Sequence, residues 1–229
     1  MTQIRGVIFD LDGTLVESND AHAHAWVQAM EEQGYNVSFE TVRPLIGMGG
    51  DKVLPQTLGI AKDTEEGKRI SQRRKEIFRQ RYVPHLRAFP GARELLERMH
   101  EQALKLLIAT SAEPDEVQAL LRVIGPHVDG WFSDIISAQE ASHSKPDPDV
   151  ISVAVERSGS SPQELVMIGD TPYDIEAAAK VNIKTIAFRC GGFRDEDLAR
   201  AMMIYDGPTD LLARYDTSAL VKGISERGE

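Results

Sequence analysis

Short apolar runs and longer amphipathic stretches alternate along the chain from Phe89 onward. Turn-forming residues bound the apolar runs, which predicts buried strands rather than helices. Together with the run near the N-terminus, they predict strands at 7–9, 104–109, 132–136, 165–168, 183–188 and 202–205. The amphipathic stretches predict helices at 91–102, 114–124, 147–158 and 172–180. Helices that alternate with nearly continuous apolar strands are typical of a parallel sheet covered on both faces.

A different pattern occupies residues 15–84, where no strand is evident. Two stretches, 20–33 and 64–82, place their apolar residues on one face of a helix. This segment therefore predicts a helical insertion of about 70 residues, which is within the usual range for a domain. We expect Trp26 and Phe78 to lie in the insertion's own core.

The predicted fold class is α/β, with a doubly wound, mainly parallel, Rossmann-like sheet, helices on both faces and an inserted all-helical domain. The α/β core domain would comprise residues 1–15 and 86–229, and the insertion residues 16–85. The polar tail after Ser218 is expected to fray.

Composition narrows the class of protein and of partner. The chain has 229 residues, 41% of them hydrophobic, and a net charge of -10. This acidic balance disfavours nucleic acid and anionic membranes, so neither is expected as a partner. The acidic overall charge does not exclude an anionic substrate, because a binding site can be locally positive. Cys190 is the only cysteine, which excludes an internal disulfide. No signal peptide or membrane-spanning stretch is evident, so we expect a cytoplasmic protein. A monomer is expected, with a dimer as the alternative.

The strongest candidate site follows the first strand, where Asp10 and Asp12 are two residues apart and Gly13 allows a tight turn. Two acids at the rim of a sheet repel each other, and they suit a divalent metal and a phosphate. One alternative is that Asp12 only helps to form an Asp-Gly turn. A calcium loop is excluded, because Ala21 stands where its bidentate glutamate belongs.

Polar residues also follow the later strands. Thr110 and Ser111 follow the second strand, Lys145 comes after the third, and Asp170 and Asp174 come after the fourth. The carboxyl ends of parallel strands meet at one edge of a sheet, so these groups should converge on Asp10 and Asp12. Together they offer a nucleophile, an oxyanion clamp and a metal site.

Each of these later residues has a structural alternative. Thr110 and Ser111 would serve equally well as caps of the helix that follows them. Lys145 lies in a polar, proline-rich run where a solvated lysine is common. Thr171 and Asp174 fit a helix start, with a threonine N-cap and an acid three residues later.

The motifs that carry this chemistry resemble those of the haloacid dehalogenase superfamily of phosphotransferases. The resemblance is to the branch of phosphoglycolate phosphatases and β-phosphoglucomutases, whose helical cap is inserted after the first strand. The matching parts are Asp10-Leu11-Asp12-Gly13-Thr14, Thr110, Lys145, Gly169-Asp170 with Asp174, and residues 16–85 as the cap.

The resemblance implies a role for each residue. Asp10 would attack phosphorus and form an aspartyl-phosphate, while Asp12 would act as general acid and then general base. Mg²⁺ would be held by the Asp10 carboxylate, the main-chain carbonyl of Asp12 and Asp170. Thr110 and Lys145 would hold the phosphoryl oxygens.

Two further positions complete the implied site. Ser111 would bind the substrate beside Thr110. Asp174 belongs to the metal site, either as a ligand or by positioning Lys145 or a metal-bound water. The implied reaction is hydrolysis of a small phosphorylated metabolite. Asp12 argues against dehalogenation, which has no alkoxide to protonate.

The cap would close over the site and select the substrate. His22, Gly49, Gly50 and Lys52 are its candidate contacts, within or near a glycine-rich loop at 47–52. The alternatives are that His22 and the neighbouring histidine at 24 lie on a helix surface, that the loop is a flexible corner, and that Lys52 is a surface residue.

Two other functions stay open. Mutases of this branch carry an arginine in the cap loop that grips a second phosphate, and residues 47–52 contain none. This favours a phosphatase, with a sugar-phosphate mutase as the alternative. A phosphorylated receiver domain also groups acids, a hydroxyl and a lysine, but it lacks a helical insertion of this length.

Overall fold

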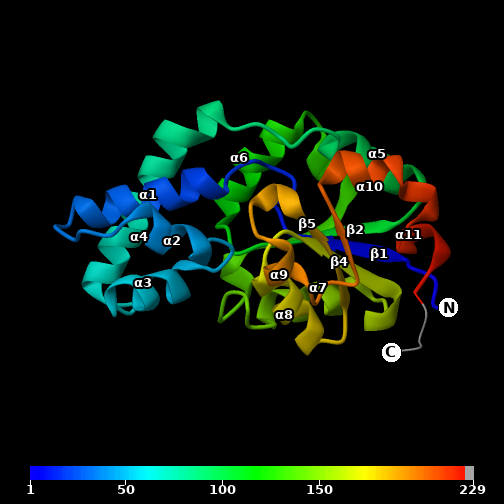
Figure 1. The fold of residues 1–229 in the computed structure, drawn as a ribbon. Coiled ribbons are helices and arrows are strands. Elements are labelled where there is room, and N and C mark those ends of the chain that lie inside the picture. Colours follow the sequence, from blue (N-terminus) through cyan, green and yellow to red (C-terminus); the bar gives the residue numbers. More distant parts are fainter. Residues whose placement is uncertain (225–229) are drawn as a thin grey trace.

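A six-stranded parallel sheet forms the centre of the computed structural model, which describes residues 1–224. The strands are β1 (Gly6–Phe9), β2 (Lys105–Ala109), β3 (Phe132–Ile136), β4 (Leu165–Gly169), β5 (Lys184–Phe188) and β6 (Met203–Tyr205). Their order is β3-β2-β1-β4-β5-β6, with every pair parallel (Figure 1). This confirms the predicted α/β, doubly wound class. The strand order reverses between β1 and β4, which is where such sheets bind ligands.

Helices cover both faces of the sheet, so its strands are apolar on both sides. Val7 and Phe9 of β1 belong to one hydrophobic cluster and Ile8 to another. The first cluster includes residues of α5 (Ala92–Glu101), α6 (Pro114–Ile124) and α10 (Pro208–Ala213). The second includes α7 (Asp149–Ser158) and α8 (Pro172–Lys180). Side chains alternate between faces along a strand, so a strand buried on both sides is an unbroken apolar run.

Residues between Val16 and Leu86 form helices joined by turns and isolated bridges. They are α1 (Asn19–Glu31), α2 (Phe39–Val42), α3 (Gly50–Leu58) and α4 (Glu65–Ile77), which continues as a π-helix at Phe78–Tyr82. Figure 1 shows this blue-to-teal unit beside the sheet. We call it the cap, and we keep its limits of 16–85 as an interpretation. Trp26 and Phe78 are buried in it, as expected.

The remaining elements are short. They are α9 (Asp195–Leu198), α11 (Ala219–Lys222) and the 3-10 turns Arg43–Leu45, Val83–His85, Val128–Trp131, Ala138–Glu140, Pro162–Glu164, Arg189–Gly191 and Tyr215–Thr217. Within residues 1–224, no helix combines the length and the apolar character needed to cross a bilayer.

Two local expectations were wrong in part. The glycine-rich segment at 47–52 is a loop only as far as Gly49, because α3 begins at Gly50. Pro55 lies inside this helix, and a proline there usually signals a break. The tail expected to fray after Ser218 begins with α11, while residues 225–229 lie outside the described part.

The buried centre of the sheet gives a first prediction. Ile8 has no exposed surface, so Ile8→Ala should leave a cavity and lower the free energy of unfolding by about 2–5 kcal/mol. Urea denaturation measures the loss. Met203→Ala, on the exposed part of β6, should change it by less than about 0.5 kcal/mol. Equal effects of the two substitutions would contradict the assignment of β1 to the centre.

Candidate active site

The two central strands deliver a carboxylate each to the same point. Asp10 follows β1 and Asp170 follows β4, its neighbour in the sheet. Gly13 turns the chain with φ of +75°, and a Cβ atom there would lie 2.4 Å from Asp170 Oδ2. Thr14 Oγ1 donates to Asp170 Oδ1 at 2.8 Å, and Asn19 Nδ2 donates to Oδ2 at 2.8 Å. The turn after β1 therefore packs against Asp170 and orients it.

Lys145 is fully buried between Asp10 and Asp174, so the alternative of a solvated surface lysine was wrong. Its Nζ donates to Asp10 Oδ1, to Asp174 Oδ1 at 2.6 Å and to the carbonyl of Ala109 at 3.2 Å. Burial alone would lower the pKa of this ammonium, but the carboxylates of Asp10 and Asp174 outweigh it and raise the pKa. Lys145 is therefore held as a cation directly beside Asp10.

Asp174 takes part in the helix start that was its structural alternative, and it also contacts Lys145 in the site. Its Oδ2 accepts from the backbone N–H of Thr171 at 3.1 Å and from Thr171 Oγ1 at 2.7 Å. Thr171 Oγ1 in turn accepts from the backbone N–H of Asp174, which completes a capping box at the start of α8. The other oxygen, Oδ1, accepts from Lys145. One carboxylate thus begins a helix and orients the buried lysine.

Three buried carboxylates and one ammonium leave this cluster short of positive charge. Oxygens of Asp10, Asp170 and Asp174 lie within 4.8 Å of one another. Burial, followed by the charge of Asp174, raises the pKa of Asp170 to about 7. Burial also raises the pKa of Asp10 well above its usual range, although Lys145 opposes the shift. Carboxylate oxygens with such a charge deficit fit a hard divalent cation such as Mg²⁺.

The carboxylate of Asp12 turns away from this cluster and toward the cap. Its Oδ1 accepts from Ser18 Oγ at 2.5 Å and lies 2.8 Å from His22 Nε2. Burial favours a high pKa for Asp12, yet the charge of His22 and the hydrogen bonds from His22 and Ser18 lower it. Asp12 therefore does more than form the Asp-Gly turn, because its side chain connects the core to α1.

The two cap histidines have different surroundings. His22 is buried and stacks on Phe78 with ring centroids 3.8 Å apart, so it is not a surface residue. His24 is exposed and packs against Phe39, as the surface alternative required. Only His22 lines the cavity above Asp10.

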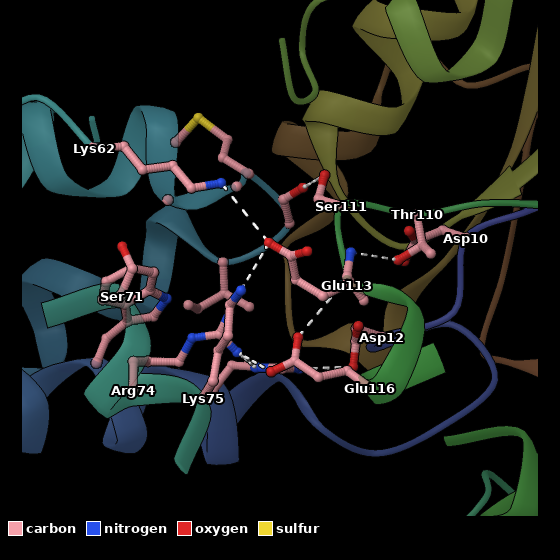
Figure 2. A pocket seen from close by; sticks show the side chains of 18 residues that line it. Asp10, Asp12, Lys62, Ser71, Arg74, Lys75, Thr110, Ser111, Glu113 and Glu116 are labelled. Atoms are coloured by element: carbon pink, nitrogen blue, oxygen red, sulfur yellow. Dashed lines mark hydrogen bonds and ion pairs between the residues drawn. The ribbon is translucent and has the colours of Figure 1, made fainter. Parts of the chain in front are cut away.

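Thr110 and Ser111 do not cap the helix that follows them, so that alternative was wrong. The N-cap of α6 is Glu113, which forms a capping box with Glu116. Thr110 is buried, and its Oγ1 accepts from the backbone N–H of Ala112 at 3.1 Å. Thr110 and Ser111 both line the cavity, beside Asp10 (Figure 2).

The cap loop is held closely on the core. Gly47 has φ of +110°, and a Cβ atom there would lie 2.7 Å from Thr171 Cγ2. Its carbonyl oxygen accepts a hydrogen bond from Ser111 Oγ at 3.4 Å. Glycine is thus required at this position by both conformation and space.

A second set of contacts joins the start of α3 to the loop that carries Lys145. The backbone N–H of Gly49 donates to Ser144 Oγ at 2.9 Å, and the backbone N–H of Ser144 donates to Asp51 Oδ2 at 3.2 Å. Lys52 pairs with Asp147 at 2.6 Å. Gly49 lines the cavity, whereas Lys52 is not among the residues around it.

The cavity lies between the cap and the carboxyl ends of the strands and measures about 50 Å³. Figure 2 shows Asp10, Asp12, Thr110 and Ser111 on one side of it, and Ser71, Arg74 and Lys75 of α4 on the other.

The sequence analysis predicted that the first group lies together, and it included Gly49 and Gly50 among the cavity residues. It missed a second group of lining residues: Lys62, Ser71, Arg74, Lys75, Glu113 and Glu116. The available signal was the helical spacing of 71, 74 and 75, which also fits a solvated face.

The sequence and the fold both match known proteins. A family model described as haloacid dehalogenase-like hydrolase matches residues 7–188. A phosphoglycolate phosphatase of Vibrio parahaemolyticus is 29% identical, covering 96% of this chain and 100% of its own length. A pyrophosphatase PpaX of Oceanobacillus iheyensis is 27% identical over 80% of this chain and 83% of its own. The crystal structure of a hydrolase from Pseudomonas syringae superposes with a TM-score of 0.86 at 31% identity, covering 94% and 98% of the two chains.

The charge deficit predicts how stability depends on pH. Between about pH 4, where an unfolded aspartate titrates, and pH 7, folded Asp170 keeps a proton that the unfolded chain has lost. The folded state therefore binds more protons in this range. Without divalent metal, the free energy of unfolding should fall as pH rises from about 4 to 7, by at least about 1 kcal/mol.

Denaturation in chelator at several pH values measures this slope. Asp170→Asn serves as the comparison, because it removes the titrating group while keeping a similar shape. The slope should be smaller in Asp170→Asn. Adding Mg²⁺ at neutral pH should stabilise the unaltered protein and stabilise Asp170→Asn much less. Parallel curves for the two proteins would contradict the assignment.

Proposed function

The chain belongs to the haloacid dehalogenase-like hydrolases, and we propose that it is a Mg²⁺-dependent phosphatase that hydrolyses a small phosphorylated metabolite through an aspartyl-phosphate. The observation that carries this proposal is the buried ammonium of Lys145 between Asp10 and Asp174, beside Asp170. The names of relatives, phosphoglycolate phosphatase and pyrophosphatase, support the same class of reaction. The proposed setting is the cytoplasm, with the protein acting as a monomer.

In the proposed reaction, an Asp10 oxygen attacks phosphorus and the bond from phosphorus to the leaving oxygen breaks. The leaving alkoxide takes a proton from Asp12, and Asp12 then accepts a proton from the water that hydrolyses the aspartyl-phosphate. The products are the alcohol, inorganic phosphate and free Asp10. His22, 2.8 Å from Asp12, holds the acid–base carboxylate in position.

The remaining groups bind and orient the phosphoryl group. Lys145 and Thr110, with Ser111 and the backbone N–H groups after Asp10, would hold its oxygens. Asp10 and Asp170 would hold Mg²⁺ together with the main-chain carbonyl of Asp12, and the cation would offset repulsion between a carboxylate and a phosphate dianion. Asp174 forms an ion pair with Lys145 and closes the capping box of α8, so we assign it to positioning Lys145.

In the cap, we propose that His22, Gly49 and Gly50 border the substrate. We assign Lys52 to holding the cap on the core, because it pairs with Asp147 instead of lining the cavity. The mutase alternative requires a grip on a second phosphate from the cap loop, and residues 47–52 carry no arginine. The hydrolase family model matches residues 7–188, so the alternative of a phosphorylated receiver domain is not retained.

Asp10→Asn tests the nucleophile. The amide is close in shape to the carboxylate but is a far poorer nucleophile, so hydrolysis of phosphate monoesters with Mg²⁺ should fall by at least about 10³-fold. Phosphate release measures turnover, and circular dichroism checks that the fold is unchanged. Wild-type rates in Asp10→Asn would overturn the mechanism.

Asp12→Ala tests the general acid. An alkoxide needs a proton on leaving, whereas an activated aryl oxide leaves without one. Hydrolysis of alkyl phosphates should therefore slow by about 10²- to 10⁴-fold, and that of para-nitrophenyl phosphate far less. The comparison uses kcat for both esters with the same preparation. Equal slowing of the two would count against the role of Asp12.

A further inference from the structure

Two buried polar groups on the cap side of the cavity have no hydrogen-bond partner. Five buried side-chain atoms in residues 1–224 lack a partner, and two of them, Ser71 Oγ and Arg74 Nε, belong to residues that line this cavity. Ser71 is only 7% exposed. Leaving a buried polar group unpaired costs roughly 1–3 kcal/mol. Positions 71 and 74 lie three apart on α4 and so on one face of it. Both residues line the cavity, and neither group has an acceptor or donor partner within residues 1–224.

The guanidinium of Arg74 is held in one orientation. Its Nη1 donates to Glu116 Oε1 of α6 at 2.6 Å and lies 3.5 Å from His22 Nδ1. Its Cζ atom lies 5.2 Å from the centre of the Trp26 ring. These contacts occupy one edge of the group and leave the Nε–H without an acceptor. Arg74 is thus oriented in advance for an acceptor that residues 1–224 do not supply.

The charges around this side of the cavity do not balance. Lys75 lies 2.9 Å from Glu113, Lys62 lies 4.0 Å from the same carboxylate, and Arg74 pairs with Glu116 (Figure 2). Three cations thus face two carboxylates, which leaves one positive charge. The capping box at the start of α6 holds both glutamates in place.

We propose that Ser71 and Arg74 form a subsite for a carboxylate at the far end of the substrate, and that the substrate is a phosphate monoester of a short hydroxy acid. This rests on the proposed phosphatase function. One hydroxyl donor and one Nε–H donor match the two oxygens of a carboxylate. The single unbalanced positive charge matches one negative charge. The small cavity fits a molecule with few atoms between phosphorus and carboxylate.

The same features disfavour the other small substrates. A second phosphate carries up to two negative charges, and it would lie close to Glu113 and Glu116 with only one positive charge to balance it. A sugar hydroxyl would accept hydrogen bonds but leave the positive charge unmatched. A carboxylate satisfies both donors and the charge.

The test compares two esters of similar length within the same enzyme preparation. Phosphoglycolate carries the carboxylate, and hydroxyethyl phosphate carries a neutral hydroxyl in its place. The ratio of their kcat/KM values isolates recognition of the carboxylate. Hydrogen bonds to charged groups contribute enough for a ratio of at least about 10 in the unaltered protein. Para-nitrophenyl phosphate reports whether the protein is a phosphatase at all.

Two substitutions address the subsite. Ser71→Ala removes the hydroxyl, and Arg74→Lys removes the Nε–H while keeping a cation for Glu116. Each should lower the ratio by about 10-fold, mainly through KM for phosphoglycolate. Arg73→Lys is the matched control, because Arg73 pairs with Glu32 and Glu76 outside the cavity. The ratio should be unchanged in Arg73→Lys.

The outcomes separate the two proposals. Hydrolysis of para-nitrophenyl phosphate without a preference for phosphoglycolate would overturn the subsite and leave the phosphatase intact. A preference that persists in both Ser71→Ala and Arg74→Lys would also overturn it, as would a stronger preference for a bisphosphate than for phosphoglycolate. No hydrolysis of any ester with Mg²⁺ would overturn the proposed function itself.

Discussion

The contact of one buried ammonium with two of three buried carboxylates governs the rest of this structure. Lys145 lies between Asp10 and Asp174, with Asp170 close by, and none of the four is appreciably exposed. Charges removed from water are tolerated only when they are paired and hydrogen-bonded. The order of strands, the turn at Gly13 and the start of α8 all act to hold these groups together. The negative charge that remains fits a divalent cation at this point.

Two carboxylates combine a contact at a helix start with a contact in the site, each through different oxygens. Asp174 closes the capping box of α8 and orients Lys145. Glu116 closes the capping box of α6 and orients Arg74. A residue tied to a helix terminus has little freedom to move, so a group that it holds is positioned before the substrate arrives. The start of α8 thus positions Lys145 on one side of the cavity, and the start of α6 positions Arg74 on the other.

The sequence indicated the fold and one half of the site for a topological reason. Apolar runs between amphipathic helices specify a parallel sheet whose strand ends must meet, so the sequence alone places Asp10, Thr110 and Asp170 together. The burial of Lys145 did not follow from its polar surroundings in the sequence. Ser71 and Arg74 were missed because their partners depend on how the cap docks, and a polar helix face looks the same whether it meets water or a cavity. The helix α3 was not predicted. It contains Pro55, and a proline inside a segment usually indicates a helix break.

The contacts of Ser144 with Gly49 and Asp51, and of Lys52 with Asp147, have a consequence for modularity. The loop that contacts the cap is the same loop that carries Lys145, so the position of the cap and the position of this lysine depend on one segment. A chimera that received its helical unit from another protein would keep these contacts only where that unit supplies partners for Ser144 and Asp147. Functional exchange of this unit would require residues 142–147 to travel with it, although they lie far away along the chain.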